Sequence, residues 1–378
     1  MLIGVPRETW PGEKRTALVP ANVKKLVRHG CDVVVQTHTG LACGFADQDY
    51  IDAGASVKSE IADVIDAADL VLRVRQPSID DVKRLKRGAA HVSFLDPFNQ
   101  PELIDAMSQQ NATAISMEMI PRSTRAQKMD ALSSQASLAG YVTVIQAAFH
   151  SPIAFPMMMT PSGTIRPARV FVIGAGVAGL QAIATAKRLG ARVEAFDTRP
   201  VVAEQVRSLG AKFVEIDLGE VGQTDQGYAK ALTPEQIELQ KAGQKKIIQQ
   251  SDIVITTAQL FGRPAPRIVT ADMIQGMKPG SVIIDMAIET GGNVEGSVLD
   301  QIVTVDGVTL IGQGNLPSEV SRNASEMYSN NLLSLFEEFW DDESKTLHFD
   351  PDDEIVRDAV ITRGGSVVNE KVTSLANA

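Results

Sequence analysis

The sequence predicts an α/β protein of two doubly wound domains with a cleft between them. Short apolar runs alternate with helix-forming segments along both halves of the chain, a pattern typical of parallel sheets covered by helices on both faces. The length of 378 residues suffices for roughly two domains of ordinary size. A glycine-rich turn between an apolar strand and a helix, at Gly174, Gly176 and Gly179, is typical of a nucleotide-binding domain. We therefore expect two Rossmann-like domains and a nucleotide in the cleft.

The first domain is expected to alternate strands and helices. Its strands are expected at residues 2–5, 32–36, 70–74, 91–95 and 112–117. Its helices are expected at residues 20–29, 47–53, 60–67, 79–86 and 101–110. No glycine fingerprint opens any of these helices, so we do not expect this domain to hold a pyrophosphate.

A second alternating series begins at Val170. Its strands are expected at residues 170–173, 192–196, 212–216, 253–257, 281–285 and 308–311. Two long amphipathic segments, Ser133–Phe149 and Ser318–Trp340, flank this series and are expected to be helices that connect the domains. The chain would then cross to the second domain and return. These crossings predict a discontinuous first domain, residues 1–135 with 320–378, and a second, nucleotide-binding domain, residues 136–319.

Two further segments stand out. Residues 360–368 predict a β-hairpin with Gly364 and Gly365 at its turn. Residues 217–233 hold three glycines, few apolar residues and one tyrosine, which predicts a mobile surface loop. A loop of this length within a compact domain is either functional, such as a lid, or disordered.

Composition limits the class of protein. The net charge of −10 argues against a nucleic-acid partner. The two cysteines, Cys31 and Cys43, fit a reduced, cytosolic compartment, and no Cys/His cluster has the spacing of a metal site. The first residues form a strand pattern instead of a signal peptide, and no apolar run approaches the ~20 residues of a membrane span. We therefore expect a soluble cytoplasmic protein with no metal.

The turn at Gly174 has the full context of a dinucleotide site. Gly174 permits the tight turn, Gly176 lets the backbone approach a pyrophosphate, and Gly179 lets helix and strand pack closely. The next strand ends at Asp197, which is placed to accept hydrogen bonds from a ribose 2′-hydroxyl and would repel a 2′-phosphate. This pattern predicts NAD(H) and not NADP(H). The alternative is a glycine-rich turn that binds no ligand.

The N-terminal residues carry a longer pattern. It reads Gly4-Val-Pro-Arg-Glu8, then Gly12-Glu-Lys-Arg15-Thr-Ala-Leu-Val-Pro20, then Val23, Leu26 and Gly30. The pattern resembles the signature shared by alanine dehydrogenases and proton-translocating NAD(P) transhydrogenases. The resemblance covers essentially the whole chain, including the Gly174 fingerprint and the segment Lys278-Pro-Gly-Ser-Val-Ile-Ile-Asp285.

The alanine dehydrogenase branch uses an Arg for the substrate carboxylate and a Lys and a His for the carbonyl and its protons. This chain keeps the Arg, as Arg15, but has Arg75 at the Lys position and Asp96 at the His position. Arginine is permanently charged and cannot serve as a general base. The five histidines, at 29, 38, 91, 150 and 348, lie in no recognisable catalytic context. Amino-acid oxidation is therefore not expected.

The transhydrogenase branch is marked by a segment present here from Met119 to Gln135. It resembles the loop with which that family holds the nicotinamide of NAD(H). The resemblance implies that the catalytic positions and polar contacts are Arg122, Gln127, Asp130 and Ser133, with Lys128 and Met129 also binding the cofactor. The last three of the four are spaced by three residues and can share one face of a turn. The alternative is a polar capping loop with Asp130 or Ser133 as N-cap.

Other positions carry over from the same family. The resemblance implies nucleotide contacts at Val177, at Thr198 and Arg199 beside the adenosine ribose, and at Thr257 at a strand end. It also places Gly227 and Tyr228 in a loop that closes over bound nucleotide. The region from Gln259 to Arg263 departs from the family pattern, so contacts just after Thr257 stay open.

The resemblance implies direct hydride transfer from NADH to NADP⁺, which needs no general acid or base. Because the chain has one fingerprint, NADP(H) must bind to a partner domain or subunit, and a membrane proton-channel subunit would couple the reaction to proton translocation. The resemblance also implies a homodimer, peripheral on the inner membrane at its cytoplasmic face. Two alternatives are an alanine dehydrogenase-like amino-acid oxidoreductase and a non-catalytic NAD(H)-sensing module.

Overall fold

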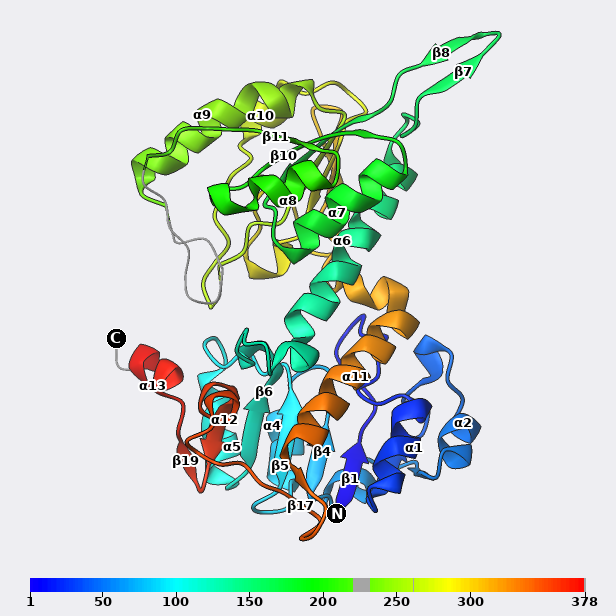
Figure 1. Cartoon of the computed structure of the whole chain (residues 1–378), viewed down its shortest axis with the longest axis vertical. Helices are drawn as coiled ribbons and strands as arrows, with labels where there is room; N and C mark the ends of the chain where they lie inside the picture. The colour runs from blue at the N-terminus through cyan, green and yellow to red at the C-terminus, as the bar shows by residue number, and fades with distance from the viewer. Residues whose placement is uncertain (220–231, 261, 377–378) are drawn as a thin grey trace. The chain divides into compact units, whose positions relative to one another are not determined.

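The computed structural model of the chain describes residues 1–219, 232–260 and 262–376. The chain divides into two compact units (Figure 1). Unit 1 combines Met1–Gln135 with Ser318–Ala378, and unit 2 is Ala136–Pro317. Each unit is built on its own mostly parallel sheet. The predicted α/β class with two Rossmann-like domains is confirmed.

Unit 1 contains an eight-stranded sheet in the order β19-β18-β6-β5-β4-β1-β2-β3. The strands are β1 Leu2–Val5, β2 Asp32–Gln36, β3 Ser56–Lys58, β4 Leu70–Leu72, β5 Ala90–Ser93, β6 Thr113–Ser116, β18 Val360–Arg363 and β19 Ser366–Val367. Strands β1 to β6 pair in parallel, and β18 is antiparallel to β6. The predicted hairpin is confirmed: Gly364 and Gly365 have φ of 60° and 78°, as a two-residue turn with two left-handed positions requires.

The helical segments of unit 1 cover both faces of this sheet (Figure 1). They are α1 Pro20–Arg28, η1 Leu41–Cys43, α2 Asp47–Asp52, α3 Ala62–Ile65, α4 Ile79–Arg84, α5 Pro101–Gln109, η2 Met117–Met119, η3 Gln127–Met129, α11 Ser321–Phe339, α12 Glu354–Ala359 and α13 Glu370–Ala376. A short hairpin, β16 Trp340–Asp341 with β17 Thr346–Leu347, follows α11. Helix α11 lies in the core, where the hydroxyl of the buried Tyr328 donates to the carbonyl of Arg73 at 2.8 Å.

Unit 2 contains a seven-stranded sheet in the order β11-β10-β9-β12-β13-β15-β14. The strands are β9 Arg169–Ile173, β10 Arg192–Phe196, β11 Lys212–Phe213, β12 Ile253–Thr256, β13 Val282–Asp285, β14 Ile302–Val305 and β15 Val308–Ile311. All pairs are parallel except β14 with β15. The strand order reverses between β9 and β12, and in doubly wound sheets ligands bind outside the carboxyl ends of the strands at this point.

The sheet of unit 2 lies between two hydrophobic cores. Successive side chains of β9 point to opposite faces of the sheet, so Val172 packs into one core and Phe171 into the other. The helical segments are α6 Ala131–His150, α7 Val177–Arg188, η4 Pro200–Val202, α8 Ala203–Ser208, α9 Pro234–Gln250, α10 Ala271–Gln275, η5 Ile288–Thr290 and η6 Leu316–Val320. The boundaries between the two units fall within α6 and η6. The two predicted long helices are confirmed as α6 and α11.

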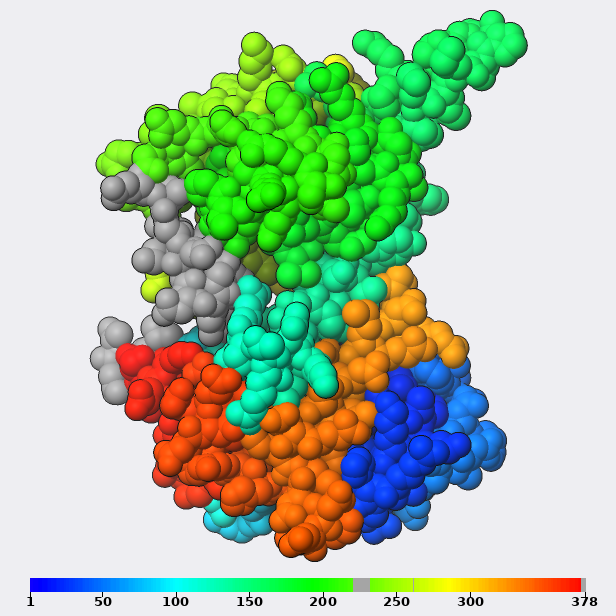
Figure 2. Space-filling model, viewed as in Figure 1, coloured from blue at the N-terminus to red at the C-terminus, as the bar shows by residue number. Residues whose placement is uncertain are grey.

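A hairpin of β7 Met158–Thr160 and β8 Gly163–Ile165 extends from the body of unit 2 (Figures 1 and 2). Its side chains include Met159, which is 76% exposed. Among the described residues no helix is long and apolar enough to cross a membrane. Nor does this part of the chain group three or more His, Cys, Asp or Glu side chains in a way that could hold a metal.

In the two main sheets, one predicted strand needs correction and two strands were missed. The predicted strand 212–216 pairs only over Lys212–Phe213, because the backbone leaves the sheet edge before Glu215. Strands β3 and β14 were not predicted. Both are edge strands of only three and four residues, which are too short to show a periodic pattern. Most of the predicted 217–233 loop, including Gly227 and Tyr228, lies outside the described residues.

Candidate functional site

The glycine fingerprint forms the turn between β9 and α7. Gly174 has φ of 99°, and a Cβ there would lie 2.3 Å from Thr257 Oγ1. A Cβ on Gly179 would lie 1.9 Å from the carbonyl oxygen of Gly174. Both positions therefore exclude any larger residue. The helix can lie this close to the strand because neither glycine has a side chain.

Gly176 differs from the other two glycines. It is the N-cap of α7, and a Cβ added there would meet no atom within 4 Å. No packing in the described protein explains a glycine at this position. The open space lies beside the first N–H groups of α7, where a helix N-terminus favours phosphate. The turn therefore fits the pyrophosphate of a dinucleotide. Val177, the first residue of α7, is 37% exposed at the same place.

Thr257 supports this turn from the neighbouring strand. It follows β12, its backbone N–H donates to the carbonyl of Ile173 at 2.9 Å, and its hydroxyl donates to the carbonyl of Gly174 at 3.2 Å. The structure thus gives Thr257 a role inside the protein that the sequence did not reveal. Its predicted contact with the nucleotide stays a prediction.

Asp197 lies directly after β10, next to the fingerprint. Asp197 is 8% exposed, and its carboxylate accepts the backbone N–H of Ala175 at 2.7 Å. Arg199 forms an ion pair with it at 2.8 Å, and this hydrogen-bonded pairing raises the pKa of Arg199. Thr198 lies between them and is half-buried. The acid and the glycine turn predicted from sequence are thus brought together at the carboxyl edge of the sheet.

In unit 1, the predicted nicotinamide loop runs into two helical segments. Gln127 and Lys128 are exposed in η3, and Arg122 is exposed upstream. Met129 is 1% exposed as a whole residue and packs in the core of unit 1, so its predicted contact with the cofactor stays a prediction. Asp130 accepts the backbone N–H of Ser133 at 2.8 Å and therefore caps α6.

Two residues that the sequence did not single out hold this loop. Asn331 of α11 is 7% exposed and donates from Nδ2 to the carbonyl of Lys128 at 2.8 Å. Arg125 donates from Nε to Glu338 at 2.6 Å and also pairs with Asp353. Asn331, Glu338 and Asp353 lie about two hundred residues after the loop in the chain. The only sequence signal for Asn331 is a polar residue on the buried face of a predicted helix.

Arg15 belongs to a buried network of charged side chains in unit 1. Arg15 donates from Nε and Nη2 to the two oxygens of Glu13 at 2.7 and 2.6 Å, and from Nη1 to Gln135 at 2.9 Å. Arg75 adds a bond from Nε to Glu13 at 3.0 Å. Burial would raise the pKa of Glu13, but Arg15 and Arg75 lower it to about 2. Arg75 thus serves as a counter-ion to Glu13.

Asp96 follows β5 in a left-handed conformation with φ of 49°. Its backbone N–H donates to Glu118, and partial burial raises the pKa of its own carboxyl. Its side chain accepts from Asn99 at 2.8 Å. At the two positions where an amino-acid dehydrogenase would carry Lys and His, the structure therefore shows a guanidinium held by Glu13 and a carboxyl held by an amide.

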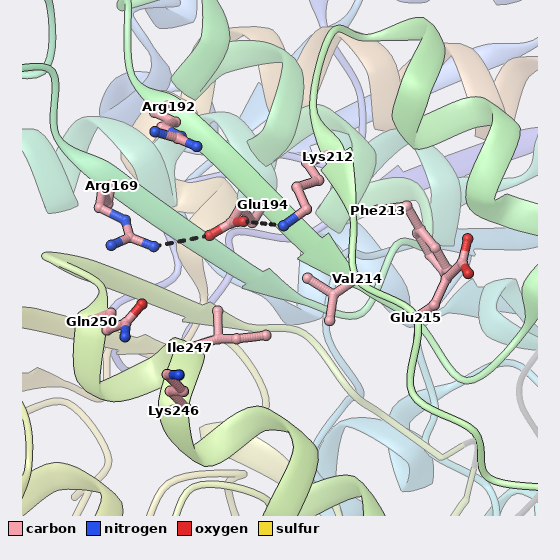
Figure 3. Close-up of a pocket in the computed structure, with 10 residues that line it drawn as sticks. All are labelled: Arg169, Arg192, Glu194, Lys212, Phe213, Val214, Glu215, Lys246, Ile247 and Gln250. Carbon is pink, nitrogen blue, oxygen red and sulfur yellow. Dashed lines mark hydrogen bonds and ion pairs between the residues drawn. The ribbon is translucent and has the colours of Figure 1, made fainter.

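A separate hollow of about 520 Å³ lies at the amino ends of the strands of the unit 2 sheet, away from the glycine turn (Figure 3). Arg169, Arg192 and Lys212 line it and are the first residues of β9, β10 and β11. Glu194 lies between two of them, 3.3 Å from Arg169 and 3.0 Å from Lys212. Burial would raise the pKa of Glu194, but these two cations lower it overall. Since nucleotides bind at the carboxyl ends of such strands, this hollow is not the candidate site.

The fold and the fingerprint define an α/β protein with two parallel-stranded units and a dinucleotide-type turn. Two family models match it: "Alanine dehydrogenase/PNT, N-terminal domain" over residues 4–139, and "Alanine dehydrogenase/PNT, C-terminal domain" over residues 143–370. The chain belongs to this alanine dehydrogenase/PNT family. The predicted family is confirmed.

The relatives include both transhydrogenase subunits and alanine dehydrogenases. The chain is 43% identical to an NAD(P) transhydrogenase subunit alpha polypeptide of Rhodospirillum rubrum, over 99% of each chain. It is 31% identical to the alanine dehydrogenase of Halomonas elongata, over 88% of this chain and 86% of that one. Among solved structures, a transhydrogenase from Sinorhizobium meliloti matches with a TM-score of 0.87 and 43% identity, covering 97% of this chain and 100% of that chain.

Proposed function

We propose that this chain is the NAD(H)-binding component of a proton-translocating NAD(P)⁺ transhydrogenase. Bound NADH would supply a hydride from C4 of its dihydronicotinamide to NADP⁺ on a partner domain. The observation that carries the proposal is the replacement of proton-transfer groups by a fixed charge network: Arg75 is held by Glu13, and Asp96 stands where a histidine would be needed. Direct hydride transfer needs no such groups, whereas amino-acid oxidation does.

The residues of the chain would then bind and orient the cofactor. The turn from Gly174 to Gly179 and the amino end of α7 would hold the pyrophosphate, and Asp197 would accept the ribose hydroxyls. An exposed amide such as Gln127 both donates and accepts, which suits a carboxamide. The residues that would orient the nicotinamide are Arg122, Gln127, Asp130 and Ser133.

The second nucleotide and the proton path belong to partners in this proposal. The name "subunit alpha" of the relatives supports an assembly with further subunits. We place the chain on the cytoplasmic face of the inner membrane, held there by a membrane proton-channel subunit. We also propose a homodimer, supported by the extended β7–β8 hairpin, where Met157 and Met159 are 60% and 76% exposed.

The test mixes the purified full chain with the NADP(H)-binding domain of a transhydrogenase. We expect rapid hydride exchange between NADH and an NADP⁺ analogue, followed by absorbance, and no exchange when either protein is omitted. Silence in this assay together with alanine-dependent reduction of NAD⁺ by the chain alone would replace the proposal with an amino-acid dehydrogenase. NADH binding without exchange would instead favour an NAD(H)-sensing module.

A further inference from the structure

The carboxylate of Asp197 accepts four hydrogen bonds. Oδ2 accepts from the backbone N–H of Ala175 at 2.7 Å and from Nη2 of Arg199 at 2.8 Å. Oδ1 accepts from the backbone N–H and from Nε of Arg199 at 2.8 and 2.9 Å. A carboxylate offers about four acceptor positions. Arg199 therefore supplies three of the four hydrogen bonds to this carboxylate.

Arg199 is also the type of residue that binds a 2′-phosphate. Its guanidinium is planar and pairs with phosphate through two parallel hydrogen bonds. In dinucleotide folds, an acid near the end of the second strand accepts the ribose hydroxyl of NAD, whereas a nearby Arg accommodates the 2′-phosphate of NADP. This chain carries both groups two residues apart, and they bind each other. The Arg199 side chain is 14% exposed in this pair, so it is held against Asp197 instead of extending into solvent.

We propose that Arg199 is a latent 2′-phosphate-binding residue, kept from that role by its pairing with Asp197. The inference rests on the proposed function, since it takes this edge of unit 2 to be an NAD(H) site. Asp197 then excludes NADP(H) in two ways. Its charge opposes the 2′-phosphate, and its hydrogen bonds hold the cation that would otherwise bind that phosphate. Such exclusion matters in a transhydrogenase, because its two nucleotides must occupy different sites.

The experiment uses 5′-ADP and 2′,5′-ADP, which differ only by the 2′-phosphate, as probes of the full chain in isothermal titration calorimetry. We expect the wild type to bind 5′-ADP more tightly. In Asp197→Ser, which keeps an oxygen for the Ala175 N–H, the affinity for 2′,5′-ADP relative to 5′-ADP should rise at least tenfold. The double variant Asp197→Ser/Arg199→Ala should lose that gain.

A gain that survives in the double variant would overturn the inference, because loss of the Asp197 charge would then explain it alone. Absence of any gain in folded Asp197→Ser, with 5′-ADP still bound, would overturn it as well. Arg199→Ala in the wild-type background is a second test that does not depend on the folding of the Asp197 variant. Because Asp197 keeps Arg199 from the phosphate in the wild type, the ratio of the two affinities should change by less than about twofold, and a fall of about tenfold would show that Arg199 already binds the phosphate beside Asp197.

The proposed function fails separately. If the wild type binds neither NADH nor 5′-ADP, the NAD(H) assignment falls and this inference falls with it. If the wild type binds NADH and exchanges hydride with its partner while the ratio does not rise in Asp197→Ser, only the role of Arg199 is wrong.

Discussion

Asp130 and Ser133 are joined by two hydrogen bonds at the start of α6. Oδ1 of Asp130 accepts the backbone N–H of Ser133 at 2.8 Å, and Oδ2 accepts its hydroxyl. The carboxylate therefore caps the helix and at the same time fixes the side chain of a second residue that we propose orients the nicotinamide. The capping and the cofactor-binding interpretations of this loop are compatible, because the carboxylate that caps the helix also holds the Ser133 side chain in place.

Replacing Asp130 with Ala should affect both stability and hydride transfer. Loss of the cap should lower the free energy of unfolding by about 1 kcal/mol, measured by urea denaturation. Without the carboxylate, Ser133 is no longer held, and exchange with the NADP(H)-binding domain should slow by about tenfold or more. Ser133→Ala is the matched control for stability, since it keeps the backbone bond of the cap. A variant of Asp130 that loses stability but exchanges hydride at the normal rate would limit the residue to capping.

The glycine fingerprint offers a matched pair of substitutions. Gly176→Ala should fold normally, because its Cβ meets no atom within 4 Å, but it should bind NADH more weakly where the pyrophosphate would lie. Gly179→Ala should be destabilised, since its Cβ would lie 1.9 Å from the carbonyl oxygen of Gly174. Thermal unfolding and NADH titration of both variants distinguish these effects. Normal NADH binding by folded Gly176→Ala would remove this turn from the pyrophosphate role.

The features that sequence predicted well are set by residues close together in the chain. The turn at Gly174 depends on the close approach of Gly179 to the carbonyl oxygen of Gly174. The α6 and α11 helices form over long stretches with no proline. The pattern Gly364-Gly365 likewise specified its hairpin through local backbone conformation. These elements form where local preference and the fold agree.

What the sequence did not predict depends on contacts distant in the chain. The Asn331 amide reaches the carbonyl of Lys128, and Gly140 is required because a Cβ there would lie 2.2 Å from the carbonyl oxygen of Ala178 on α7. Neither residue has a local pattern that reveals its partner. The pairing of Asp197 with Arg199 is local, yet the family resemblance implied only that both flank a ribose. It could not show that they bind each other.

Asn331→Ala should disturb the orientation of the nicotinamide more than the binding of the nucleotide. The variant removes the bond to Lys128 and the acceptor for the hydroxyl of Ser134, so η3 would lose this hydrogen bond to α11. We expect kcat of hydride exchange to fall several-fold, with KM for NADH changed by less than about twofold. Asn323→Ala, an exposed position on the same helix, is the control. Equal effects of the two substitutions would show that Asn331 has no specific role in positioning.

His91 should make the protein sensitive to acid. It is fully buried in β5, and its Nδ1 has no hydrogen-bond partner among the described residues. Burial, and then the charge of Arg73, lower the pKa of His91 from 6.5 to about 3. Between these two values the unfolded chain binds the proton and the folded chain does not, so stability is fully present above about pH 6.5 and is lost as pH falls.

Urea denaturation of the wild type and of His91→Gln at pH 7 and pH 5 isolates this effect. The linkage predicts that the wild type loses about 2 kcal/mol more than the variant between these pH values. The comparison with the variant is necessary because desolvation raises the pKa of Glu8 to about 7, and that carboxyl changes stability in the opposite direction in both proteins. If the difference in unfolding free energy between the two proteins is the same at both pH values, His91 does not stay neutral in the folded state over this range.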